Sequence, residues 1–496
     1  MQYNSTRNIN KKFTSAVAMK EGLASDGGLF VPEEFPALTT EDYDYLIDCS
    51  YVKRAAYILK KFLSDFSLEE LESYAEKAYG NGKFSGENPT PMYSYDETTA
   101  FLELWHGPTC AFKDMALQML PHLLTASVKK TGDDRTVCIL VATSGDTGKA
   151  ALDGFSGVEG SKIIVFYPKD GVSDIQKMQM ITQKGDNVFV SGVDGNFDDA
   201  QTGVKTIFTD DEFNDSLHKN GVILSSANSI NWGRLVPQVV YYISAYCDLV
   251  KAHQISLGDQ FNVCVPTGNF GNILAAYYAK KMGLPIGKLI CASNSNNVLT
   301  DFINTGVYDR NRAFMLTMSP SMDILISSNL ERYLYDVSGK DDCYIRQLMD
   351  SLKQEGKYEV TEEIKAKIKA DFYGGFATEE ETLSEIKTAF CEKNYLMDTH
   401  TAVAASVLKK YRQETGDDTI CVVASTASPY KFTDSVMEGL HIPTRGDEFE
   451  RLDALHQVSH LPVPKQLAEL KNMEKRFTTY CKKDGMKQVV TEFLAK

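Results

Sequence analysis

The sequence lacks paired cysteines and long apolar runs, and both absences narrow the class of protein. Its ten cysteines are scattered singly without a CxxC pair, and Cys138 and Cys264 lie inside apolar runs. This pattern favours small buried side chains over disulfides or zinc ligands, so we expect no metal. No apolar run approaches the length of a membrane span, and the polar start MQYNSTRNINKK has no signal-peptide core. We therefore expect a soluble cytoplasmic protein without a membrane partner.

Positive charge is also scarce. The chain has 52 lysines and arginines against 67 aspartates and glutamates, which gives a net charge of −15. This excess disfavours nucleic acid and anionic membranes as main partners. An acidic protein that binds an anionic small molecule must concentrate positive potential locally, at helix N-termini or through a few lysines and arginines. Its hydrophobic share of 43% is ordinary, and 496 residues suffice for two or three domains.

The chain contains no internal repeat, but its pattern changes along its length. Residues 1–95 mix turn signals with amphipathic helical pattern and end near the breakers of 80–91. From 96 to 334, short β-branched apolar runs alternate with helical pattern, which is typical of parallel strands with covering helices. These runs, with one more near the C-terminus, are 136–143, 162–167, 187–191, 261–267, 288–292 and 419–425. Residues 335–395 are charged and helical in pattern, and 396–496 end as mixed polar helix. The expected fold class is α/β, with open, mostly parallel sheets and flanking helices.

In such sheets, ligands bind beyond the carboxyl ends of the strands, where loops lead into helices. One such loop follows the run 261–267 and consists of Gly268, Asn269, Phe270, Gly271 and Asn272. Glycines before a helix let backbone N–H groups approach a phosphate, and the helix dipole favours an anion there. The alternative is a tight turn with an asparagine cap. The loop has neither the GxxxxGK[ST] spacing of triphosphate-binding loops nor the GxGxxG of dinucleotide folds.

Three further loops have the same position after a strand. The first, Ser144, Gly145, Asp146 and Thr147, presents hydroxyl and N–H groups suited to a carboxylate, or is a capped helix start without a ligand. In the second, Asn231 and Arg234 lie where a long apolar helical pattern begins. They form either a second anion site or a solvated helix cap. The third, Ala424 to Pro429, offers small hydroxyls, a weak signal by itself.

The stretch HGPTCAFKD, residues 106–114, raises a separate question about Lys113. A lysine at a helix start is either a solvated charge or a sheltered amine, and the motif alone does not decide between them. A lysine that forms a Schiff base must be partly neutral, and burial and nearby positive charge favour the neutral form. A cofactor that is both an aldehyde and a phosphate ester would use this lysine and the Gly268–Asn272 loop together. Pyridoxal 5'-phosphate is such a cofactor.

The residues HGPTCAFKD, SGDTG, NSINWGR and GNFGN, in this order, resemble the threonine synthase family, in the longer form with an extra N-terminal domain. The resemblance covers nearly the whole chain. It implies the fold type II architecture of pyridoxal-phosphate enzymes, with the N-terminal domain at 1–95, the catalytic core at 96–334, a helical insertion at 335–395 and a part completing the core at 396–496. Cys110, Asn272 and Ser428 differ from the residues that are usual in the family.

The same resemblance assigns roles to individual residues. Lys113 corresponds to the Schiff-base lysine, and Thr426 faces the pyridine nitrogen. The cofactor phosphate is assigned to Gly268, Asn269, Phe270, Gly271 and Asn272. The substrate is assigned to Ser144, Gly145, Asp146, Thr147, Asn231 and Arg234, of which the last two are candidates for its phosphate.

The implied reaction converts O-phospho-L-homoserine and water to L-threonine and phosphate, by a monomer or homodimer. Two alternatives stay open: a related phospho-lyase that gives 2-oxobutyrate, and a non-catalytic threonine-synthase-like binding protein. A dinucleotide-dependent dehydrogenase is disfavoured because its glycine signature is missing.

Overall fold

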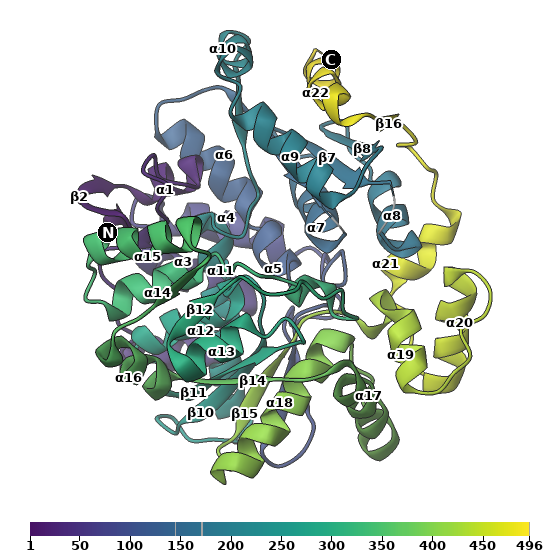
Figure 1. The fold of residues 1–496 in the computed structure, drawn as a ribbon. Helices are drawn as coiled ribbons and strands as arrows, with labels where there is room; N and C mark the ends of the chain where they lie inside the picture. The colour runs from purple at the N-terminus through teal and green to yellow at the C-terminus, as the bar shows by residue number, and fades with distance from the viewer. Residues whose placement is uncertain (144, 170–171, 496) are drawn as a thin grey trace.

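Two mainly parallel sheets dominate the computed structural model, which describes residues 1–143, 145–169 and 172–495. In Figure 1 the smaller sheet lies in the upper half, the larger one lies in the lower half, and helix α5 (Asp114–Leu117) lies between them. The larger sheet has the strand order β14-β11-β10-β15-β5-β4, and its strands are parallel except for β4. Its strands are β4 (Met92–Ser94), β5 (Thr99–Glu103), β10 (Phe261–Pro266), β11 (Ile286–Ser293), β14 (Phe372–Phe376) and β15 (Cys421–Ser425).

The smaller sheet has the order β16-β8-β7-β6-β9 and is parallel throughout. Its strands are β6 (Thr136–Ala142), β7 (Ser161–Pro168), β8 (Val188–Val193), β9 (Val222–Ser225) and β16 (Tyr480–Cys481). Helices α7 (Asp146–Phe155), α8 (Asp174–Ile181), α9 (Phe197–Phe208) and α10 (Asp211–Lys219) accompany it. Every strand expected from the sequence is present, and the α/β fold class is confirmed.

Parallel strands are buried on both faces, and their residues alternate between two cores. Val263 and Val265 of β10 pack into one apolar cluster, whereas Cys264 between them packs into another. Strand β6 does the same, with Ile139 on one face and Cys138 on the other. Both cysteines are fully buried free thiols, as expected from the sequence.

The N-terminal region shares a core with the rest of the chain. It contains the strands β1 (Tyr3–Ser5), β2 (Asn8–Phe13) and β3 (Phe30–Pro32), and the helices α1 (Ser15–Glu21), α2 (Thr40–Asp48), α3 (Tyr51–Phe62) and α4 (Leu68–Tyr79). The rings of Tyr3 and Phe62 pack on Trp232 of helix α11 (Trp232–Lys251), with ring centroids 5.3 and 5.8 Å away. The fully buried Arg332 side chain donates to the carbonyls of Phe30 (2.9 Å) and Ile230 (2.6 Å), so it links this region to the loop before α11.

The charged segment 335–395 contains the expected helices and, in addition, two strands that its pattern does not predict, the short β13 (Lys357–Glu359) and β14. Strand β14 pairs with β11 at one edge of the larger sheet. It includes Gly374 and Gly375, where a Cβ atom would lie 3.0 Å from Ile303 and 2.8 Å from Val407. The two glycines thus allow close packing on both faces of the strand, and they also hide it from a reading based on β propensity.

The remaining helices and short strands pack around the two sheets and the N-terminal region. They are α6 (Leu120–Lys130), α12 (Gly271–Lys281), α13 (Val298–Thr305), β12 (Val307–Asp309), η1 (Pro320–Met322), α14 (Leu330–Val337), α15 (Asp342–Gln354), β13 (Lys357–Glu359), α16 (Glu362–Asp371), α17 (Glu379–Lys393), α18 (Thr399–Thr415), η2 (Pro429–Lys431), α19 (Thr433–Gly439), α20 (Glu448–Ser459), α21 (Lys465–Ala468), η3 (Glu469–Asn472), η4 (Lys483–Gly485) and α22 (Met486–Leu494). Among the described residues, no helix is long and apolar enough to cross a membrane.

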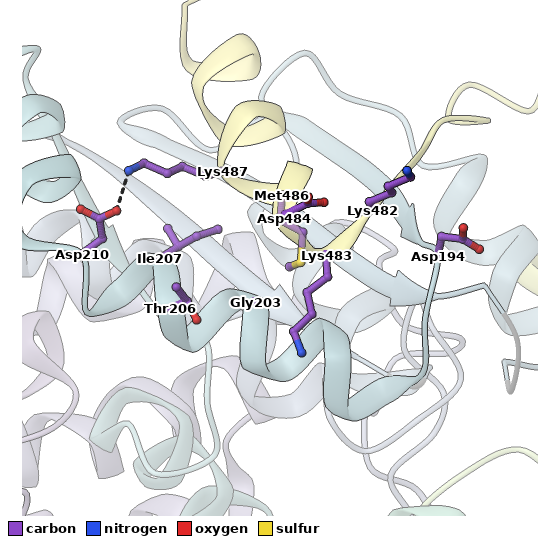
Figure 2. Close-up of a pocket in the computed structure, with 10 residues that line it drawn as sticks. All are labelled: Asp194, Gly203, Thr206, Ile207, Asp210, Lys482, Lys483, Asp484, Met486 and Lys487. Atoms are coloured by element: carbon purple, nitrogen blue, oxygen red, sulfur yellow. Dashed lines mark hydrogen bonds and ion pairs between the residues drawn. The ribbon is translucent and has the colours of Figure 1, made fainter.

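The C-terminal tail returns to the smaller sheet. Strand β16 extends it beside β8, and α22 packs on α9, where Lys487 pairs with Asp210 at 2.5 Å (Figure 2). A groove between α9 and the tail is lined by Gly203, Ile207, Met486 and their neighbours. None of the site residues expected from the sequence lines this groove.

Candidate functional site

The amine of Lys113 lies in a sheltered position at the start of α5, not on the surface. Its side chain is 11% exposed. The Nζ atom donates to Oγ of Ser321 at 3.1 Å and lies 3.7 Å from a carboxylate oxygen of Asp146. Burial lowers the pKa of Lys113; Asp146 opposes this shift, while the positive charges of Lys431 and Arg234 add to it. The amine is therefore easier to deprotonate than an ordinary lysine.

The loop before Lys113 is held by a buried carboxyl group and by the turn around Thr426. Asp114 is fully buried and accepts from the backbone N–H (2.8 Å) and the hydroxyl (2.7 Å) of Thr109. Burial, with a contribution from the charge of Asp153, raises the pKa of Asp114 to about 7. On the other side, Phe112 N–H donates to the Thr426 carbonyl at 2.8 Å. These contacts bring Lys113 and Thr426 together, although they lie far apart in the sequence.

The loop between β10 and α12 approaches the segment around Ser321 closely. A Cβ atom on Gly268 would lie 2.6 Å from the Ser321 carbonyl oxygen, so only glycine fits there without a shift. Phe270 has a φ of 62°, a left-handed conformation that turns the chain into α12. The first N–H groups of this helix have no acceptor within it, as at any helix start. Such a turn can hold an anion.

A buried polar network backs this loop. The Oδ1 atom of Asn272 accepts from the hydroxyls of Tyr241 (2.7 Å) and Tyr242. Its Nδ2 group is buried and has no hydrogen-bond partner among the described residues. The side chain of Asn329 donates to the Asn269 carbonyl at 3.0 Å, which fixes the loop from its other side.

The loop between β6 and α7 carries a buried carboxylate. Ser144 lies outside the described residues; Gly145 and Gly148 donate to the Thr143 hydroxyl, each at 3.0 Å. Asp146 forms an ion pair at 2.6 Å with Lys431, whose side chain is fully buried. Burial alone would raise the pKa of Asp146, but Lys431 and Lys113 outweigh it and hold this pKa below its usual range.

Other contacts surround this carboxylate. Gln176 donates to Asp146 at 3.1 Å, and Lys431 also donates to the Thr109 carbonyl at 2.8 Å. Lys431 therefore joins α7, the Lys113 loop and the turn after Thr426. Thr147 is only partly buried on the first turn of α7. The sequence reasoning did not single out Lys431 or Ser321.

The start of α11 contains a cap residue and an arginine that has no carboxylate partner among the described residues. Asn231 donates to the Met19 carbonyl (2.9 Å) and accepts from Gly233 N–H (2.8 Å), so both side-chain polar groups have partners within the chain. Arg234 is 5% exposed and donates to the Ala227 carbonyl at 2.8 Å. Its Nε atom has no partner in the described part of the chain, and burial lowers its pKa to about 10. This cation is available to an anionic ligand.

Family models match almost the whole chain. Residues 2–79 match the model described as threonine synthase N terminus. Residues 84–426 match the model for pyridoxal-phosphate dependent enzymes, and 401–490 match the model for the C-terminal part of threonine synthase.

Similar curated proteins fall into two groups. Human threonine synthase-like 1 is 44% identical over 444 residues, which are 88% of this chain but 59% of the human protein, so this chain spans about three fifths of its length. Threonine synthases from Schizosaccharomyces pombe and Pseudomonas aeruginosa are each 36% identical, with 88% of this chain covered and 88% and 90% of theirs.

Two solved structures are similar to this chain over its full length. The pyridoxal-phosphate-bound threonine synthase of Brucella melitensis has a TM-score of 0.89 and 35% identity, with 100% of both chains covered. The threonine synthase from yeast has a TM-score of 0.88 and 32% identity, with 100% of this chain and 99% of that chain covered.

Proposed function

Since the chain belongs to the threonine synthase family of pyridoxal-phosphate-dependent enzymes, we propose that it is a threonine synthase that converts O-phospho-L-homoserine and water to L-threonine and phosphate. The observation that carries this proposal is the sheltered Lys113 amine, whose pKa is lowered by burial. Such an amine can both bind an aldehyde and exchange a proton.

The residues around Lys113 fit pyridoxal phosphate. The start of α12 offers free N–H groups to the phosphate, and Gly268 permits the close approach of the loop to Ser321. The hydroxyl of Thr426, adjacent to the Lys113 loop, is proposed to face the pyridine nitrogen. When bound, the cofactor supplies an aldehyde that combines with amines and a conjugated ring that accepts electrons from the substrate.

The substrate groups are assigned by charge. We assign the substrate carboxylate to the start of α7, at Gly145, Asp146 and Thr147, where backbone N–H groups lie at a helix N-terminus. Ser144, which lies outside the described residues, is assigned with them from the family resemblance alone. We assign the substrate phosphate to Arg234, because its buried guanidinium has neither a carboxylate partner nor a partner for Nε within residues 1–143, 145–169 and 172–495. Asn231 caps α11 with its side-chain oxygen and donates its amide to the Met19 carbonyl, which supports a role in orienting this turn; its role as a direct ligand stays a prediction.

Lys113 is proposed to move the proton. With the cofactor bound, the free Lys113 amine would remove the α proton of the substrate and later return one to the same carbon, and for this it must be neutral at working pH. Burial lowers its pKa in the required direction. The buried Lys431 keeps the neighbouring Asp146 ionised and paired, so that this carboxylate does not pull Lys113 fully into its charged form.

A product assay tests the proposal. Purified protein with added pyridoxal phosphate and O-phospho-L-homoserine is expected to release threonine and phosphate in equal amounts. Release of 2-oxobutyrate instead would indicate the phospho-lyase. This assay is needed because the chain also matches proteins named threonine synthase-like 1.

Cofactor capture provides the second test. A visible absorption band is expected with the native sequence and not with Lys113→Ala, whereas no band with either protein would indicate a non-catalytic binding protein. The division at residues 95, 334 and 395, the cytoplasmic location and the monomeric or homodimeric state stay predictions.

A further inference from the structure

Ser321 contacts the reactive amine, although it belongs to none of the sequence motifs. Its Oγ atom lies 3.1 Å from Nζ of Lys113, 208 residues away in the chain. Ser321 lies on the short η1 turn and is exposed to solvent, so the amine and the hydroxyl meet where a small molecule can reach both. The close approach of Gly268 to the Ser321 carbonyl fixes the same turn against the α12 loop.

A buried histidine holds the backbone of Ser321. The Ser321 N–H donates to Nε2 of His400 at 3.2 Å. The other ring nitrogen, Nδ1, lies 2.8 Å from a carboxylate oxygen of Asp398, which is fully buried. Since Nε2 accepts a hydrogen bond, the network assigns the ring proton to Nδ1, where it is donated to Asp398. His400 thus connects Asp398, the N-cap of α18, to the backbone of Ser321.

The two partners that the amine has among the described residues differ in chemistry. The Asp146 carboxylate can only accept hydrogen bonds, so it favours the ammonium form of Lys113. A serine hydroxyl accepts an N–H from the ammonium form and donates its own proton to the lone pair of the neutral amine. Ser321 can therefore hold the amine in place in both protonation states.

We propose that Ser321 is a further catalytic residue, which orients the free Lys113 amine while it takes up and returns the substrate proton, and that His400 is the positioning residue that fixes Ser321. The role of Ser321 in the substrate reaction rests on the proposed function. The first test below is independent of that function, because it measures the reaction of the Lys113 amine with pyridoxal phosphate and uses no substrate.

Charged groups near Lys113 also shift its pKa, and their effect has to be distinguished from that of Ser321. Asp146 on α7 favours the ammonium form, whereas Lys431 on η2 and Arg234 on α11 disfavour it. None of them changes in Ser321→Ala. Loss of the hydroxyl removes an acceptor from the ammonium form, and hydrogen bonds to charged groups are the stronger ones. The amine should then lose its proton at lower pH.

The experiment measures how fast the full-length protein, freed of cofactor, captures pyridoxal phosphate at different pH values, from the growth of visible absorbance. In Ser321→Ala the midpoint of this pH profile is expected to fall by about one unit. Ser321→Thr, which keeps a hydroxyl, should retain the native midpoint. Thr317→Ala is the matched control: it loosens the same segment, where the Thr317 hydroxyl donates to Asp323 at 2.7 Å, without touching Lys113.

Turnover gives an independent measurement. In Ser321→Ala, kcat is expected to fall about ten- to a hundredfold with little change in KM, because the amine acts in the chemical step. His400→Leu should reproduce the midpoint shift in part, and His400→Gln, which keeps an acceptor, should restore it. A native midpoint in Ser321→Ala, or an equal shift in Thr317→Ala, would overturn the proposal. If the native protein captures the cofactor but forms no threonine, the proposed function fails while the pH comparison still tests Ser321.

Discussion

At the scale of single residues, Arg234 is unusual because it is buried and no carboxylate in the described part of the chain pairs with it. Its one hydrogen bond to protein goes to the Ala227 carbonyl, and its Nε is unpaired within the described residues. A buried charge without a partner lowers stability, and proteins keep such groups mainly at functional sites. We therefore predict that Arg234→Met loses activity without losing stability.

The expected loss in kcat/KM for O-phospho-L-homoserine is about ten- to a hundredfold, the size of one or two charge-assisted hydrogen bonds. Steady-state kinetics measure this loss, and thermal unfolding of the same variant should give an unchanged or higher Tm. A large fall in Tm with native kinetics would instead make Arg234 a structural residue.

Lys431 presents the opposite case, a buried charge with a partner. Its ion pair with Asp146 spans 2.6 Å, and the side chain is fully buried. Lys431→Met should therefore lower the free energy of unfolding by about 3–5 kcal/mol, because Asp146 is left buried beside Lys113 alone. Adding Asp146→Asn should recover part of this loss. Urea unfolding of both single variants and the double variant measures the coupling energy between Lys431 and Asp146. Strictly additive effects of the two substitutions would contradict the prediction.

The sequence singles out Lys113, Gly268–Asn272 and Thr426 through motifs that resemble those of a known family, and the roles of these residues stay predictions. Lys431 and Ser321 have no comparable signature. A lysine in SPYKF is indistinguishable from a solvated one, and its burial depends on strand β15 delivering it next to α7. Ser321 meets Lys113 only through contacts across 208 residues. Such partners are set by tertiary packing, which no local pattern encodes.

At the scale of elements, the strands that form long apolar runs in the sequence were the predictable ones. Strands β6, β7 and β10 read as continuous apolar runs because both of their faces are covered. Strands β4, β5, β9, β14 and β16 of the two sheets were not predicted; β9 has only 4 residues, and β14 contains paired glycines.

The turn between β10 and α12 provides a test at the same scale. A Cβ atom at position 268 would lie 2.6 Å from the Ser321 carbonyl, whereas one at 271 would lie 3.5 Å from Asn329, an ordinary contact. Gly268→Ala should therefore destabilise the cofactor-free chain by about 1–3 kcal/mol. Gly271→Ala, the matched control, should be neutral or slightly stabilising. Denaturant unfolding decides, and equal values for the two variants would exclude a tight contact at Gly268.

At the scale of the whole molecule, the N-terminal region and the catalytic half form one apolar core. The buried rings of Tyr3 and Phe62 contact Trp232, and Arg7 reaches Glu331 on α14 through two hydrogen bonds of 2.9 and 2.8 Å. The N-terminal region thus packs against α11, the helix that carries Arg234. This support was not visible from the sequence, where the breakers near residue 80 indicate only a boundary.

The pH dependence of unfolding should report the buried carboxyl group next to Lys113. Burial raises the pKa of Asp114 to about 7, while an unfolded aspartate has a pKa of about 3.9. The folded state therefore favours the protonated form. Its contribution to stability is fully present below the unfolded pKa and is lost as pH rises through the folded pKa. Asp146, whose pKa is lowered, contributes in the opposite sense and only at acid pH.

Asp114→Asn separates the two contributions, because it removes the titrating group and keeps an acceptor for Thr109. Between the unfolded and folded pKa values of Asp114, the native protein should lose free energy of unfolding relative to Asp114→Asn as pH rises. Below that window the difference should be constant. Urea unfolding of both proteins at several pH values gives the difference directly. A difference that does not change with pH would mean that the Thr109 hydrogen bonds outweigh burial and keep Asp114 ionised.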